Sequence, residues 1–122
     1  MYKINFYKDA SGREPVREYL DMLAGNGDKQ SRVKLNKIRD YMKILSMHGT
    51  YAGEPYVKFI SDEIWELRPK NDRILFFGWT GAQFIMLHCF VKKSNKIPQR
   101  EIDQAKRNMQ DFIKRSGDDE QK

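Results

Sequence analysis

Two arginines, Arg68 and Arg73, flank a short polar stretch in the segment IWELRPKNDRILFF. The apolar and aromatic residues on both sides are typical of two strands joined by a tight turn, which would bring the two guanidinium groups together. Guanidinium groups bind phosphate through paired hydrogen bonds and stabilise negative charge that builds on phosphorus. The alternative is that the arginines form surface salt bridges with Glu66 and Asp72, each worth less than about 1 kcal/mol.

Further cations follow a later apolar stretch. Lys92 and Lys93 come directly after the apolar run 84–91. In a meander of antiparallel strands, every second strand runs in the same direction, so Arg68 and Lys92 end at the same edge of the sheet. Arg73 begins its strand at that edge as well. The sequence therefore predicts that cations from three strands converge on one rim, and a positive rim near aromatic rings suits RNA.

The charge of the chain also favours an anionic partner. Lysine and arginine total 23 against 17 aspartates and glutamates, a net charge of +6. Residues 92–115 hold eight basic residues and only three acidic ones. Such a bias favours nucleic acid first and an acidic protein second. A well-solvated basic helix is the alternative interpretation.

Few residues suit other chemistries. Two histidines and one cysteine, without ligand spacing, predict no metal site, and we expect no cofactor. Cys89 is predicted to be a small core residue. His88, inside an apolar stretch, is either a hydrogen-bonded structural histidine or part of an active site. The absence of a signal-peptide pattern and of ~20 consecutive apolar residues favours a cytoplasmic location.

The elements that must position these residues follow from the hydrophobic periodicity. Alternation predicts strands, and apolar spacings of three and four predict amphipathic helices. The length of 122 residues suits one domain, 1–116, followed by a polar tail at 117–122 that we expect to be disordered. The predicted strands are 2–7, 57–60, 64–68, 73–79 and 83–91, and the predicted helices begin at Pro15 and span 29–47 and 98–114.

The predicted fold class is α+β. We expect an antiparallel sheet, made of the N-terminal strand and the C-terminal meander. An N-terminal hairpin of two antiparallel helices and a C-terminal helix would pack on it. The strand at 83–91 is apolar on both faces, which predicts an interior strand covered by helices.

The order of these elements and two motifs resemble the RelE/ParE toxin superfamily, and most closely its HigB-like, phage-related branch. The first motif is the hairpin WELRPKNDRILFF. The second and more specific motif is LHCFVKKSNKIP at residues 87–98, followed by REIDQA at 100–105. The resemblance runs from Tyr2 to about Lys114 and implies a small RelE-like domain.

The resemblance implies the toxin of a type II toxin–antitoxin pair. Such a toxin is an endoribonuclease that cuts messenger RNA, usually on the ribosome, and so inhibits translation. The ribose 2′-hydroxyl attacks the adjacent phosphate and leaves a 2′,3′-cyclic phosphate and a 5′-hydroxyl, without a metal. The implied partners are mRNA, the ribosome and a separate antitoxin, often with a helix-turn-helix domain. DNA contact would then run through the antitoxin, and no membrane contact is implied.

The resemblance also assigns roles to residues by position. Arg73 would stabilise the phosphate in the transition state, and Arg68 would bind the phosphate beside it. Lys92 or Lys93 would neutralise charge on the nonbridging or leaving oxygens. Four more cations are expected to bind RNA: Lys58, Lys70, Lys96 and Arg100.

The general base stays open between two residues. Glu66 shares a strand face with Arg68, and His88 shares one with Lys92. Some relatives use a tyrosine near the C-terminus, but this chain has no tyrosine after Tyr56.

Two other functions fit the same fold. One is a ParE-like inhibitor that binds DNA gyrase and cuts nothing, and the other is a noncatalytic RNA-binding module. A gyrase inhibitor has no need of a phosphate-binding rim, so the retained cations favour the nuclease.

Overall fold

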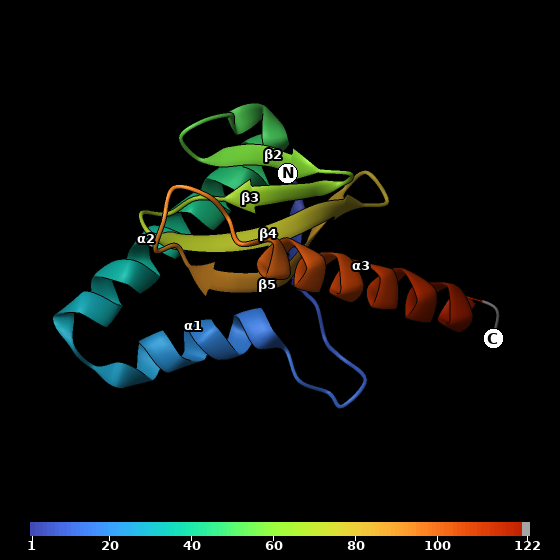
Figure 1. The fold of residues 1–122 in the computed structure, drawn as a ribbon, viewed down its shortest axis with the longest axis horizontal. Helices are drawn as coiled ribbons and strands as arrows, with labels where there is room; N and C mark the ends of the chain where they lie inside the picture. Colours follow the sequence, from blue (N-terminus) through green and yellow to red (C-terminus); the bar gives the residue numbers. More distant parts are fainter. Residues whose placement is uncertain (121–122) are drawn as a thin grey trace.

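One five-stranded sheet forms the centre of the molecule, with helices on both of its faces (Figure 1). The computed structural model describes the backbone of residues 1–120 and the side chains of residues 1–117. The strands are β1 (Lys3–Phe6), β2 (Val57–Ser61), β3 (Ile64–Leu67), β4 (Asp72–Trp79) and β5 (Gln83–Val91). The helices are α1 (Pro15–Asn26), α2 (Lys29–His48), the short 3₁₀ helix η1 (Gly49–Ala52) and α3 (Gln99–Glu120).

The sheet has the order β1-β5-β4-β3-β2. Strands β2 to β5 form the predicted antiparallel meander, and the α+β class with helices before and after it is confirmed as a RelE-like fold. β1 differs from the prediction because it pairs with β5 in parallel, with Lys3 opposite Gln83 and Phe6 opposite Met86. Alternation fixes which side chains are buried, but it contains no information about strand direction, so the sequence could not reveal this pairing.

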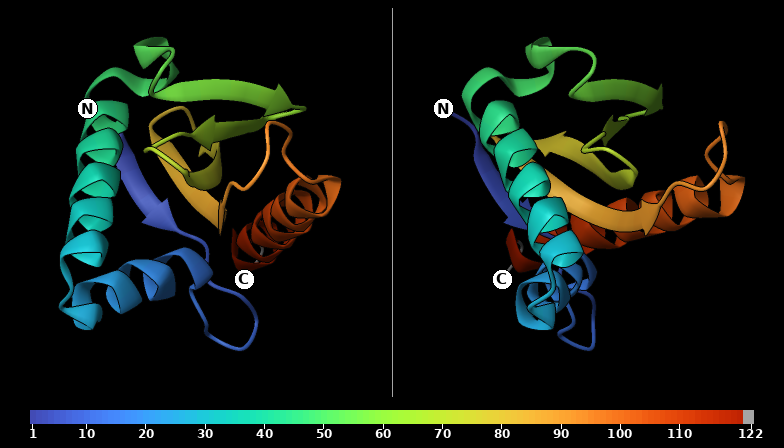
Figure 2. Two further views of the ribbon diagram at one scale, coloured as in Figure 1. Left: turned by 60° about the vertical axis from the view of Figure 1, so that its left-hand side comes forward. Right: turned by 90° about the vertical axis from the view of Figure 1, so that its left-hand side faces the viewer.

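Helices α1 and α2 cover one face of the sheet. Pro15 opens α1, and Gly27 ends it with a left-handed φ of 72°. Asp28 then caps α2 by accepting a hydrogen bond from the Ser31 backbone N–H at 2.7 Å. The chain reverses between α1 and α2, which are separated only by Gly27 and Asp28, so the predicted helical hairpin is confirmed (Figure 1). Figure 2 shows that the two helix axes diverge from the end where they are joined.

Helix α3 covers the opposite face. The apolar residues of β4 and β5 therefore split into two clusters by alternation. Ile74, Phe76 and Met86 pack with α1 and α2, whereas Leu75 and Leu87 pack with α3. The prediction that β5 is an interior strand covered by helices is confirmed.

A bulge in β5 changes which side chains face α3. Leu75 of β4 pairs with His88, but the next residue, Phe76, pairs with Met86, so Leu87 is an extra residue. Leu87 and His88 consequently share the α3 face, and the alternation continues from His88. Phe90 and Lys92 then lie on the α3 face, while Val91 lies on the α2 face.

The C-terminal helix is longer than predicted. It was expected to end near Lys114, but it continues through Gly117 to Glu120. Most of the segment 117–122, predicted to be a polar tail, is therefore helical, and residues 121–122 lie outside the described residues. No helix in the described part of the chain combines the length and apolar character needed to cross a membrane.

Candidate functional site

A pocket of about 320 Å³ lies on the α3 face, where β3 ends and the loop after β5 leads into α3. Because β3 and β5 run in the same direction, their ends bring Arg68 and Lys92 to one rim, as predicted. Lys92 is fixed there by its backbone N–H, which donates to the Asn71 carbonyl at 2.8 Å. The pocket is lined by Lys58, Ile60, Glu66, Arg68, Lys92, Asn95, Lys96, Ile97 and Ile102.

Glu66 is the acidic residue of this pocket. Its side chain is only 2% exposed. Its Oε1 lies 3.0 Å from Arg68 Nε and 3.7 Å from Arg73 Nε, although neither N–H donates a hydrogen bond to it. Its Oε2 is buried and has no hydrogen-bond partner in the described structure. An ionisable group buried with a free acceptor oxygen is uncommon in a purely structural role.

Arg73 lies beside Glu66 and is positioned by hydrogen bonds to the backbone of the turn. Its Nη1 donates hydrogen bonds to the backbone carbonyl of Asp72 at 2.9 Å and to that of Lys70. Two carbonyls of the turn therefore bind the guanidinium through the same nitrogen. Its side chain is 9% exposed. The prediction that the hairpin brings the two arginines together is confirmed through their shared contact with Glu66. The alternative of ordinary surface salt bridges does not describe this buried group.

Burial is the largest influence on the pKa values of both Glu66 and Arg73. It raises the pKa of Glu66, an effect that the cations Arg73, Arg68, Lys92 and Lys58 only partly oppose. Burial likewise lowers the pKa of Arg73, which Glu66 opposes, but a guanidinium stays protonated in proteins. A carboxylate with a raised pKa is a stronger base than an ordinary surface glutamate.

Arg68 differs from Arg73 in its access to the pocket. Its side chain is 22% exposed, and its Nη1 forms an additional ion pair with Glu54 Oε1 at 2.8 Å. Glu54 is itself 63% exposed, so this partner can move into solvent. A phosphate that enters the pocket could therefore replace Glu54 as the partner of Arg68.

His88, the second candidate base, lies elsewhere. Glu66 pairs with Leu75 and Leu75 pairs with His88, so two strand spacings, about 10 Å, separate the two residues. His88 Nε2 contacts Glu101 Oε1 at 3.0 Å, and the ring stacks on Phe90. It lines a different pocket, under α3 and beside Tyr7. The geometry therefore favours the structural interpretation of His88.

The other predicted residues divide among three places. Lys58 and Lys96 line the pocket with Glu66, and Lys58 sits directly opposite Glu66 in the β2–β3 pair. Lys93 and Arg100 are exposed and do not line it. Lys70 lines another pocket, on the α2 face of the same rim.

Sequence reasoning missed the part of the pocket formed by the loop after β5 and by α3. Asn95 supplies an amide, while Ile97 and Ile102 supply apolar walls. These residues could have been suspected from the sequence because they follow β5, whose end reaches the rim, and lie in or just before the next helix. The thiol of Cys89 takes no part, because burial raises its pKa to about 12.

The arrangement combines two chemical capacities. Guanidinium and ammonium groups can bind a phosphate and balance charge on it, and a buried carboxylate can accept a proton from a hydroxyl. Within the described residues, no three histidine, cysteine or acidic side chains gather in a way that could hold a metal ion.

Comparisons with known proteins agree with this description at the level of the family. No curated protein matches the chain significantly. The family model for phage-derived proteins of the Gp49-like type (DUF891) matches residues 19–110, a stretch that contains β2 to β5, most of both α1 and α3, and every residue that lines the pocket. The chain therefore belongs to the Gp49-like family of phage-derived proteins, a family of RelE- and HigB-type toxin-like proteins.

Proposed function

We propose that this protein is the toxin of a type II toxin–antitoxin system and cuts messenger RNA on the ribosome. The observation that carries the proposal is the buried carboxylate of Glu66, held against Arg68 and Arg73 in a pocket that Lys92 also lines. Membership in a toxin-like family supports the same conclusion.

In the proposed reaction, the ribose 2′-hydroxyl attacks the adjacent phosphate. The ionised Glu66 accepts the hydroxyl proton, the new P–O2′ bond forms, and the bond from phosphorus to the 5′-oxygen breaks. Arg68 and Arg73 bind the nonbridging oxygens, where negative charge increases in the transition state. Lys92 balances the charge on the departing 5′-oxygen, which takes a proton from solvent water to become the 5′-hydroxyl. The products are a 2′,3′-cyclic phosphate and a 5′-hydroxyl end.

Glu66 is proposed as the base in preference to His88. Glu66 has an unpartnered oxygen within the phosphate-binding group, whereas the Nε2 of His88 already contacts Glu101. The raised pKa makes the Glu66 carboxylate a stronger base, and the group is ionised at pH values above that pKa.

The partners are proposed from the exposure of the cations. Arg73 is almost fully covered, so RNA must be held in one orientation to reach it, and the ribosome would supply that orientation. An antitoxin, proposed as a separate helix-turn-helix protein, would block this approach. DNA contact by the pair would then belong to the antitoxin.

Primer extension on a reporter transcript in a reconstituted translation system tests the proposal. Wild-type protein and an Arg73→Ala variant are compared with and without ribosomes, and mass spectrometry identifies the new RNA ends. Cuts that need ribosomes, carry cyclic phosphate ends and disappear in Arg73→Ala are expected. A Lys93→Ala variant is the matched control, since it removes an exposed cation from the same rim without touching the pocket.

Two results would contradict the proposal. Equal cutting by wild type and a folded Arg73→Ala variant would remove Arg73 from the site. No cutting under any condition, combined with inhibition of gyrase supercoiling, would identify the ParE-like alternative.

A further inference from the structure

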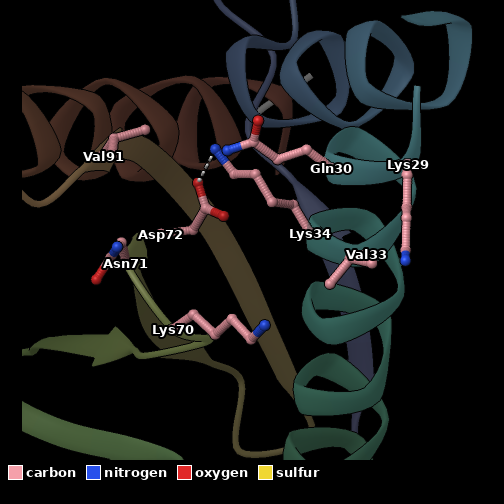
Figure 3. A pocket seen from close by; sticks show the side chains of 8 residues that line it. All are labelled: Lys29, Gln30, Val33, Lys34, Lys70, Asn71, Asp72 and Val91. Carbon is pink, nitrogen blue, oxygen red and sulfur yellow. Dashed lines mark ion pairs between the residues drawn. The ribbon is translucent and has the colours of Figure 1, made fainter. Parts of the chain in front are cut away.

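A second pocket lies on the opposite face of the same rim, between α2 and the turn before β4 (Figure 3). Its volume is about 530 Å³, within the range of roughly 300–1,000 Å³ that small-ligand pockets occupy. In Figure 3, Lys34 and Lys70 extend into the space between the two elements from opposite sides. The lining residues are Lys29, Gln30, Val33, Lys34, Lys70, Asn71, Asp72 and Val91.

The lining of this pocket suits an anion attached to an apolar or aromatic group. Three lysines and one acid, Asp72, line it, and Asp72 Oδ1 lies 3.5 Å from Lys34 Nζ. Within the described residues, neither Lys29 nor Lys70 forms an ion pair, so both keep their charge available. Val33 and Val91 are 40% and 41% exposed, so both offer apolar surface to a ligand in this pocket.

The two pockets share their rim. Val91 lines the second pocket and the next residue, Lys92, lines the first, because consecutive strand residues point to opposite faces. The turn between the arginines lines the second pocket and also holds Arg73 beside Glu66. The side chain of Lys70 enters the second pocket, while its carbonyl accepts a hydrogen bond from Arg73. A flexible strand of RNA that crosses this rim would meet cations on both sides.

We propose that the pocket formed by Lys29, Val33, Lys70 and Val91 binds a nucleotide of the same RNA strand that the Glu66 pocket holds. Lys29 and Lys70 bind its phosphate, the two valines contact the sugar or base, and the amides of Gln30 and Asn71 supply polar contacts. The inference rests on RNA being the ligand of the proposed function. It adds a second binding site on the other face of the sheet.

Occupancy of this site would also affect Arg73. Lys70 has a left-handed φ of 55°, and the turn that it belongs to holds the Arg73 guanidinium through two carbonyls. A phosphate bound to Lys70 would steady that turn. Loss of the site is therefore expected to lower kcat as well as to raise KM.

Backbone amide spectra of the ¹⁵N-labelled protein test the proposal. The probes are a dinucleotide and a hexanucleotide in which every ribose is 2′-O-methylated, so that neither can be cut. The hexanucleotide should shift the amides of Gln30, Val33 and Asn71, and the dinucleotide should shift them less. Lys29→Gln should lower the slope of log affinity against log salt by about 0.7, the effect of one lost phosphate contact on single-stranded nucleic acid. Val33→Asp should weaken hexanucleotide binding roughly tenfold by charge repulsion.

Arg32→Gln is the matched control. It removes one positive charge from the same turn of α2, but Arg32 lines a different pocket and is exposed. Its salt slope and affinity should stay close to the wild-type values. Val33 and Lys29 are exposed, so their variants should fold, and their amide spectra verify this directly.

The outcomes separate this inference from the proposed function. Shifts at the second pocket without any RNA cutting would support the nucleotide site and contradict the nuclease. Cutting with shifts confined to the Glu66 pocket would overturn the nucleotide site and leave the nuclease intact. Equal effects of Lys29→Gln and Arg32→Gln would also overturn the site. Absence of RNA binding, with shifts produced by an acidic peptide instead, would replace it with a protein-docking surface.

Discussion

Two buried carboxylates lie at the same rim of the sheet, on opposite faces, and their surroundings differ. Asp72 faces α1 and α2, accepts a hydrogen bond from Tyr19 Oη and pairs with Lys34. Glu66 faces α3 and touches two arginines, but one of its oxygens has no partner and burial raises its pKa. Both side chains are at most 3% exposed, so burial alone does not distinguish them.

The comparison separates an acid that anchors the fold from an acid that is available for chemistry. The bonds to Asp72 connect the turn to both N-terminal helices, and its backbone carbonyl holds Arg73. Glu66 keeps an unused acceptor next to cations, which is typical of reactive groups and costly in structural ones. Substitution of Asp72 should therefore mainly lower stability, and substitution of Glu66 should mainly lower activity.

The largest expected effect is on Arg73. In Arg73→Lys, a single ammonium cannot keep the hydrogen bonds to the turn and also lie beside Glu66, so RNA cutting should fall about 100-fold or more. Primer extension over a time course measures the rate. Retention of most of the activity would mean that charge alone is sufficient at this position. It would also weaken the distinction between a reactive carboxylate, Glu66, on one face of the rim and a structural one, Asp72, on the other.

Glu66→Gln should reduce cutting by about 100-fold, the usual contribution of a general base. The carboxylate must be ionised to accept a proton, so wild-type activity should rise with pH through the raised pKa of Glu66 and then level off. The variant should lack this rise. Measurements of the cutting rate of both proteins across the acidic pH range decide whether the rise in activity is due to ionisation of Glu66.

The same pKa shift predicts how stability depends on pH. The folded protein holds the Glu66 proton more tightly than the unfolded chain does, because the folded pKa is raised. The stabilisation is full below the ordinary glutamate pKa of about 4.3 and is lost as pH rises through the folded value. Urea denaturation at several pH values should show that Glu66→Gln removes this loss. An unchanged pH dependence would show that Glu66 is not the titrating group.

Substitutions at Asp72 are expected to lower the stability of the protein more than its activity, the reverse of those at Glu66. Asp72→Ala removes charged hydrogen bonds to both helices and should lower the free energy of unfolding by about 2 kcal/mol. Tyr19→Phe, which removes one hydroxyl from the same carboxylate, should cost about 1 kcal/mol. Urea denaturation measures both. If Tyr19→Phe abolished cutting without lowering stability, Asp72 would belong to the reactive group instead.

The smallest effect is expected for His88. His88→Gln keeps a side chain able to contact Glu101, so stability should change by less than about 1 kcal/mol and the cutting rate by less than about twofold. Thermal unfolding and primer extension are the measurements. A large loss of activity at unchanged stability would return His88 to the position of general base.

Several features of the site could be read from the sequence because they depend on local chemistry. The polar turn between two apolar stretches predicts the hairpin that joins β3 and β4, and the hairpin brings Arg68 and Arg73 to a common partner. The direction of strands in a meander predicts that Lys92 reaches the same rim. Neither conclusion needs contacts between distant parts of the chain.

Other features depend on long-range packing. The bulge at Leu87 places Lys92 in the pocket, whereas uninterrupted alternation from Leu87 would place Lys93 on that face. Lys70 lies two residues from Arg68, yet its side chain belongs to the opposite face. The loop before α3 and α3 itself line the pocket around Glu66, and a strand pattern does not contain them.

The sequence by itself determined the class of the fold, the strand order of the meander and the positive charge of one rim. These follow from side-chain alternation, turn chemistry and residue counts, all of which are local. Only the tertiary structure decided that β1 runs parallel to β5, that Lys92 faces the site and that Glu66 keeps a buried oxygen without a partner while Asp72 binds Tyr19 and Lys34. The physical reason is that pairing direction, bulges and hydrogen-bond satisfaction are settled by residues far apart in the chain.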